Sequence, residues 1–188
     1  GVSRITVRDA IRTLEAQGIL TVVLGARGGL RIAEAATDRV SDSLAVQLHL
    51  EAVTRAEVTE AMAAIEPTTA RRAADQCDAD DERRLRMLLA ETEAASQDPE
   101  AFTAKALDFH LCVAEIARNR ALIASVRALR IAEQRHFAPQ TTPAVVGRVL
   151  DAHRAIAEAV IAHDAETAMR EMAAHLEKVA GSRPQAIC

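Results

Sequence analysis

Aromatic side chains are almost absent from this sequence. Its 188 residues include three phenylalanines and neither tryptophan nor tyrosine, so aromatic residues make up only 2%. Proteins that bind single-stranded nucleic acids stack the bases on aromatic rings, and this scarcity argues against that class. Glycine and proline are also few, with seven and five residues. We therefore expect long helices rather than a β fold with many turns.

Cysteine is scarce as well. Cys77, Cys112 and Cys188 are odd in number and far apart in the sequence, so neither a disulfide framework nor a CxxC metal knuckle is expected. A reducing, cytoplasmic location is the simplest interpretation. No apolar run approaches the roughly 20 residues that a membrane span needs, and no signal peptide is visible, so we expect no membrane partner.

Charge is distributed unevenly along the chain. Hydrophobic residues make up 49% and charged residues 27%, which is typical of a globular protein. Residues 1–33 contain five arginines and two acidic residues, a net charge of +3, whereas the whole chain carries −4 and the remainder therefore −7. A basic head on an acidic body suggests that the head meets a polyanion. A chance fluctuation of surface charge is the alternative.

The first 33 residues have the pattern of a helix followed by a β-hairpin. Ser3 is a candidate helix N-cap and Gly18 a helix stop. A β-branched run at 19–24 and a short apolar run at 30–32 flank a glycine-rich turn that contains Arg27. A helix in the major groove with a hairpin wing on the flanking backbone is the arrangement of winged helix-turn-helix proteins.

From residue 34 onward the sequence predicts a helical bundle. We expect a linker at 34–38, an all-helical domain at 39–182 and a tail at 183–188. Alanine-rich segments with a period of 3.6 residues predict seven helices, at 39–49, 54–75, 79–96, 99–117, 120–137, 143–162 and 165–181. The expected fold class is mainly α, with a partial winged-helix head and an all-α bundle of about 150 residues.

The head closely resembles the second half of the winged-helix domain of the GntR family. That family has the pattern GVSR-x-x-VR-x-A-x-x-x-LE-x-x-G, followed by a strand and a wing. The matching residues are Gly1, Val2, Ser3, Arg4, Val7, Arg8, Ala10, Leu14, Glu15 and Gly18. The wing departs slightly from the pattern, because it has Arg27-Gly28-Gly29-Leu30 where one glycine and a larger residue are usual. The resemblance implies that two helices and a strand preceding GVSR are missing from this sequence.

The helical remainder resembles the FCD ligand-binding domain of the FadR subfamily. The segments that carry this resemblance are Ala64-Ile65-Glu66-Pro67, Phe109-His110, Asn119, the stretch from Asp151 to Ile156, and Ala174-His175-Leu176. The resemblance implies a transcriptional regulator rather than an enzyme. Its head binds double-stranded operator DNA, and its body binds a small effector, expected to be a carboxylate. A homodimer is also expected, since palindromic operators need two heads.

Five residues of the head are predicted to contact DNA. Arg4 and Arg8 are one turn apart on the same helix face, in the part of a recognition helix that reaches base edges. An arginine there can bind guanine O6 and N7, while Ser3 and Thr6 suit phosphate oxygens. The resemblance adds Arg27 at the wing tip. Two solvated arginines on a surface helix are the alternative.

Three of the six histidines lie on apolar helix faces. His110, His153 and His175 have apolar neighbours at helical spacing. His153 and His175 lie eleven residues before and after the turn near Asp164, so an antiparallel helical hairpin places both at one height inside the bundle. The remaining histidines are expected at the surface or at helix ends: His49, His136 and His163.

The resemblance to FCD domains implies a divalent metal site. In that domain the ligands are an Asp-x-x-x-His pair and two later histidines, and His110, His153 and His175 match the histidine positions. The Asp position is Ala106, which implies a weakened site, with Glu171 as a candidate replacement. Zn²⁺, Ni²⁺ and Mn²⁺ are the candidate metals. Three core histidines hydrogen-bonded to their neighbours are the alternative.

A second feature of the family is missing. Many relatives carry an arginine facing the effector pocket four residues before Glu66, and this sequence has Met62 there. An acidic effector then needs another cation, and Arg127 and Arg130 are the candidates. A less polar effector is the alternative.

A metal-dependent hydrolase is the competing functional class, because three histidines with an open position are also a catalytic zinc arrangement. The sequence has no HExxH motif, no glycine-rich phosphate loop and no apparent Ser-His-Asp set. A helical interaction module without a ligand is a third possibility.

Overall fold

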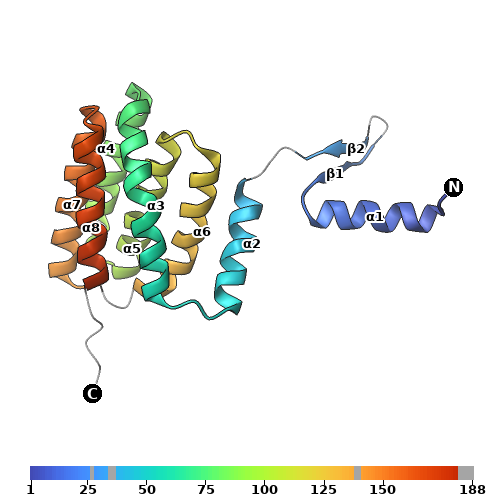
Figure 1. Ribbon diagram of the computed structural model, residues 1–188, viewed down its shortest axis with the longest axis horizontal. Coiled ribbons are helices and arrows are strands. Elements are labelled where there is room, and N and C mark those ends of the chain that lie inside the picture. The colour runs from blue at the N-terminus through green and yellow to red at the C-terminus, as the bar shows by residue number, and fades with distance from the viewer. Residues whose placement is uncertain (26–27, 34–36, 138–140, 182–188) are drawn as a thin grey trace, which may run out of the picture. The chain divides into compact units, whose positions relative to one another are not determined.

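The structure, a computed structural model, describes residues 1–25, 28–33, 37–137 and 141–181. The chain forms two compact units, Gly1–Val40 and Ser41–Cys188, and each is described by itself. Within the described residues there are eight helices and one two-stranded sheet (Figure 1). The predicted fold class, mainly α with a small hairpin, is confirmed.

Unit 1 consists of one helix and one hairpin. Helix α1 (Arg4–Ala16) begins after Ser3, whose hydroxyl accepts a hydrogen bond from the Thr6 backbone N–H at 3.1 Å. It ends before Gly18, which has a φ of 73°, a left-handed conformation that glycine adopts without strain. Strands β1 (Leu20–Val23) and β2 (Gly29–Ile32) then pair in antiparallel fashion.

The two adjacent glycines at the hairpin tip are each required for a different structural reason. A Cβ atom on Gly28 would overlap the Val23 carbonyl oxygen. Gly29 has a φ of 145°, which side chains rarely tolerate. The departure of this wing from the GntR pattern therefore accompanies a tight turn that neither position could make with a larger residue.

Unit 1 has little core of its own. None of its described side chains is buried, and the best protected, such as Ile11, Leu14 and Leu20, are half-buried. Val2, Ile5 and Leu24 are exposed. A two-stranded hairpin is marginal by itself in water, so this unit depends on further packing for its stability.

Unit 2 is a helical bundle. Its helices are α2 (Thr37–Leu50), which begins in unit 1, α3 (Arg55–Gln76), α4 (Ala79–Ala94), α5 (Pro99–Ile116), α6 (Arg120–Phe137), α7 (Pro143–Ile161) and α8 (Ala165–Gly181). These bounds agree with the seven predicted helices to within two residues. The starts are set by capping side chains, which accept hydrogen bonds from first-turn backbone N–H groups: Thr54, Asp78, Asp98, Asn119, Thr142 and Asp164.

Helix α3 is the central helix of unit 2. It packs against α5, α6, α7 and α8, which lie around it in Figure 1. Ala70, Ala73 and Ala74 are fully buried, and such small side chains let neighbouring helices approach closely. The core of this bundle holds the polar side chains described below.

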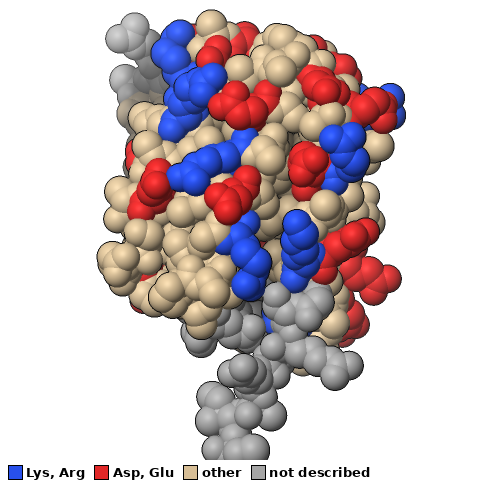
Figure 2. All heavy atoms as spheres, turned by 90° about the vertical axis from the view of Figure 1, so that its left-hand side faces the viewer, with Lys and Arg blue, Asp and Glu red and all other residues tan. Residues whose placement is uncertain are grey.

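The surface of unit 2 that Figure 2 shows carries interspersed charges of both signs. Several ion pairs join helices of unit 2, such as Arg154 with Glu93 at 2.9 Å and Arg71 with Glu166 at 3.0 Å. A mixed surface of this kind does not attract a polyanion strongly. No described helix is both long and apolar enough to span a membrane.

Candidate metal and effector site

The structure brings together the three histidines that the sequence singled out. His110 on α5, His153 on α7 and His175 on α8 each offer one ring nitrogen, and these nitrogens lie within 4.8 Å of one another. The side chains are buried, with exposed fractions of 5%, 0% and 5%. His110 Nε2 and His153 Nε2 face each other at 3.2 Å. The convergence predicted from the α7–α8 hairpin is present, since the rings of His153 and His175 are 4.9 Å apart.

A buried carboxylate orients the first of these histidines. Glu66 on α3 is fully buried, and its Oε2 accepts a hydrogen bond from His110 Nδ1. This bond leaves His110 Nε2 to face the cluster. A carboxylate behind a histidine is the usual outer support of a metal ligand. Sequence reasoning used Glu66 only as part of a family motif and missed this contact, because α3 and α5 meet only in the folded bundle.

Protonation states differ across the cluster. Burial, reinforced by the charges of the neighbouring histidines, lowers the pKa of His153 well below its ordinary value and that of His175 to about 3. Burial also acts against the charged form of His110, but the Glu66 carboxylate outweighs it and raises the pKa of His110. His153 and His175 are therefore neutral at pH 7, as metal ligands must be, whereas the Glu66 carboxylate favours the protonated form of His110, whose Nε2 proton a metal would displace.

The donor set fits a divalent metal. Three imidazoles are a common set for Zn²⁺ and suit Ni²⁺. His153 Nδ1 is buried and has no hydrogen-bond partner among the described residues, so hydrogen bonding within the core does not fully satisfy this ring. Ala106, at the family's Asp position, lies beside the histidines on the wall of the same cavity. A metal there would keep at least one position for water or another ligand.

The cavity beside the histidines is small and mostly apolar. Its volume is about 70 Å³, and its walls come from α3, α5, α6, α7, α8 and the segment before α7. Met62, at the position where family relatives carry an arginine, contributes to this wall. Glu171, the candidate replacement for the missing Asp, is outside the wall, half-buried beside Arg170.

Two arginines predicted for the effector lie elsewhere. Arg127 donates to Glu115 at 3.2 Å, and Arg130 pairs with Asp108. Neither residue is part of the described cavity wall. Periodicity alone could not assign them to a helix face, and the structure places them against acidic side chains of α5.

Two charged residues near the cavity were missed by sequence reasoning. Glu133 on α6 lies in the wall and is 2% exposed. Arg55, at the start of α3, donates to the carbonyl oxygen of Val179, another wall residue, at 3.0 Å. The available signal for Glu133 was an acidic residue in line with Val126 and Leu129, both of them buried apolar residues of α6.

The predicted DNA-contacting residues lie together at the start of α1. Ser3, Arg4, Thr6 and Arg8 are all exposed, and the Ser3 and Thr6 hydroxyls are 2.9 Å apart. Arg27, predicted at the wing tip, lies outside the described residues.

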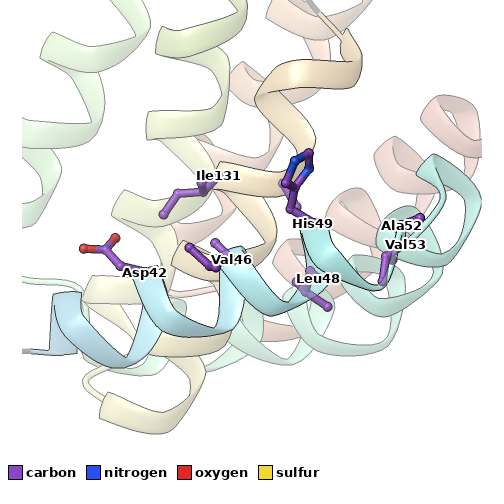
Figure 3. A pocket seen from close by; sticks show the side chains of 9 residues that line it. Asp42, Val46, Leu48, His49, Ala52, Val53 and Ile131 are labelled. Atoms are coloured by element: carbon purple, nitrogen blue, oxygen red, sulfur yellow. The ribbon is translucent and has the colours of Figure 1, made fainter. Parts of the chain in front are cut away.

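The other histidines are placed as follows. His49 lines a second hollow of about 650 Å³, an apolar groove beside α2 with Ile131 on its other side (Figure 3). His163 follows α7, and its Nδ1 donates to the Ala74 carbonyl oxygen at 2.8 Å. The side chain of His136 lies outside the described part of the chain.

Comparison with known proteins agrees with this architecture. Residues 57–178 match the FCD domain family. An Escherichia coli (strain K12) protein named for the regulation of an L-lactate dehydrogenase operon is 29% identical over 192 residues, covering 95% of this chain and 71% of that protein.

Solved structures show the same fold. Streptococcus agalactiae GntR superposes with a TM-score of 0.67 at 22% identity, covering 96% of this chain and 83% of the other. Escherichia coli McbR/YncC gives 0.54 at 17% identity, with coverages of 95% and 84%. None of these comparisons supports the hydrolase alternative. The chain therefore belongs to the FCD domain family.

Proposed function

We propose that this chain is a metal-containing regulator whose operator affinity responds to a small acidic metabolite bound in unit 2. The observation that carries the proposal is the buried cluster of His110, His153 and His175 at the wall of a small cavity. These three side chains would hold the metal, and Glu66 would orient His110. The bound metal would supply a positive charge for an anionic ligand in an otherwise apolar cavity. Met62 and the other apolar wall residues would surround the ligand and exclude water.

The first metabolite to test is suggested by a relative. The Escherichia coli protein is named for an L-lactate dehydrogenase operon, and a cavity of about 70 Å³ suits a molecule far smaller than the usual occupants of binding pockets. L-lactate should therefore change the operator affinity of the metal-loaded regulator in an electrophoretic or fluorescence binding assay. Unchanged affinity for every small acid tested, with metal bound, would contradict the proposal.

Operator recognition is proposed to use the exposed start of α1. Arg8→Ala should weaken operator binding about 5- to 150-fold, the usual value of an arginine bidentate to guanine. Arg72→Ala, which removes an exposed arginine of unit 2, is the matched control and should change affinity little. Titrations at several salt concentrations should show a steep salt dependence for both proteins. Equal affinities of the two variants would argue against Arg8 as a base contact.

A homodimer is also proposed, because two heads are needed to read a palindromic operator and two-fold pairing is the commonest form of assembly. Exposed apolar side chains on α2, including Val40 and Leu50, offer surface for pairing. Light scattering at tens of micromolar, roughly above ordinary interface dissociation constants, should give twice the chain mass. A monomer mass at that concentration would refute the dimer.

A further inference from the structure

One polar group in the cavity wall has no role in the site described so far. Glu133 is 2% exposed, and its Oε2 atom has no hydrogen-bond partner among the described residues. Leaving a buried carboxyl oxygen unpaired costs free energy, so native structures rarely keep such a group without a use. The unpaired oxygen belongs to a residue of the cavity wall, where a ligand can reach it.

The other polar groups of the wall are already engaged. Thr103 donates to the Pro99 carbonyl oxygen and lies 2.9 Å from the Thr141 hydroxyl. Apart from these two residues and the histidine cluster, the described wall is apolar, with Glu133 as its one charged or acidic member. A ligand bound at the histidine cluster would thus meet one further side chain that can form a hydrogen bond with it, that of Glu133.

The surroundings of Glu133 select the kind of group it can bind. Burial, with the Glu66 carboxylate adding to it, raises the pKa of Glu133 to about 8, against opposing effects of His110 and Arg55. A ligand that placed a second carboxylate beside Glu133 would bring its negative charge near the Glu66 carboxylate and into an apolar wall. Both surroundings are unfavourable for an anion. A hydroxyl both donates and accepts, so it can pair with Glu133 in either protonation state.

We propose that Glu133 is the specificity-determining residue of the cavity, and that it binds the hydroxyl group of a small hydroxy acid whose carboxylate lies at the histidine cluster. This inference rests on the proposed effector function of the cavity. It predicts that a hydroxy acid is preferred over the same acid without its hydroxyl. A site built around a buried hydrogen bond rejects an analogue that leaves its polar group unpaired.

The test uses the full chain loaded with Zn²⁺ and titrated calorimetrically with L-lactate and with propionate. The wild type should bind L-lactate about 10- to 100-fold more tightly. Glu133→Leu should reduce this preference to about twofold or less, and Glu133→Gln, whose amide still donates and accepts, should keep part of it. Glu171→Leu makes the same replacement outside the cavity and should leave the preference unchanged.

A stability measurement separates a binding role from a structural one. Without ligand or metal, Glu133→Leu should unfold at the same temperature as the wild type or higher, because it replaces an unpaired buried carboxyl with an apolar group. A lower midpoint, an undiminished preference in Glu133→Leu, or no binding of L-lactate to the wild type would overturn the assignment. Zinc binding and operator binding, measured on the same samples, show whether the proposed function stands when this assignment fails.

Discussion

Chelation of the metal proposed for the three-histidine cluster is expected to lower the unfolding midpoint of the protein by roughly 10 °C. A metal present at 1,000 times its dissociation constant stabilises the folded state by about 4 kcal/mol, and about 1 kcal/mol shifts the midpoint of a chain of this size by about 2–4 °C. His153→Ala should abolish the difference between loaded and chelated protein. Calorimetric melts of Zn²⁺-loaded samples, with and without chelator, measure it.

Two further variants make the metal prediction specific. His49→Ala removes an exposed imidazole outside the cluster and should keep the full effect of chelation. Ala106→Asp should tighten metal binding, because it adds a carboxylate one turn before His110 on the cavity wall. If neither the wild type nor Ala106→Asp takes up Zn²⁺ or Ni²⁺, the three histidines are core residues only.

The effect of chelation should depend on pH. In chelated protein, the pair of His110 with Glu66 gives stability that is complete below pH 6.5 and is lost as pH rises through the raised pKa of His110. Glu133 also lowers the stability of the folded protein as pH rises. Its pKa is about 8 in the folded protein, so its contribution to stability falls between about pH 4.5 and pH 8. Metal binding, which displaces a proton, strengthens over the same range. Melts at pH 6 and pH 8 should therefore show the larger effect of chelation at pH 8.

Truncation of one ring beside the cluster should have the largest effect on stability. Phe109 is fully buried, and its ring stacks on His153 with centroids 4.2 Å apart. Phe109→Ala should lower the free energy of unfolding by about 3–5 kcal/mol, the usual cost of such a cavity. Metal affinity should fall too, because His153 loses the surface that holds its ring in place.

Denaturant unfolding and Zn²⁺ titration of the same samples give both quantities. Phe109→Leu is the matched control, since it keeps most of the buried volume and should lose less of each. A loss below about 1 kcal/mol in Phe109→Ala would mean that the bundle closes over the missing ring.

The helices could be predicted from the sequence because their signals are local. Asp98 followed by Pro99 marks a helix start within a few residues, whatever lies around it. The approach of His153 to His175 also follows from one short turn and two regular helices. The acidic partners of the site could not be found in this way. Glu66 meets His110 across 44 positions of sequence, and which residues of α3 and α6 face the cavity is decided by the packing of the whole bundle.

The three histidines are separated by different distances in the sequence. His153 and His175 belong to a hairpin of consecutive helices, whereas His110 lies 43 positions before His153. Local hairpins form sooner than long-range contacts. A metal present during folding would thus find two ligands before the third arrives, and refolding in its presence would favour early closure of α7 on α8. If a metal binds these histidines as proposed, its supply would influence the order in which the helices of the bundle assemble.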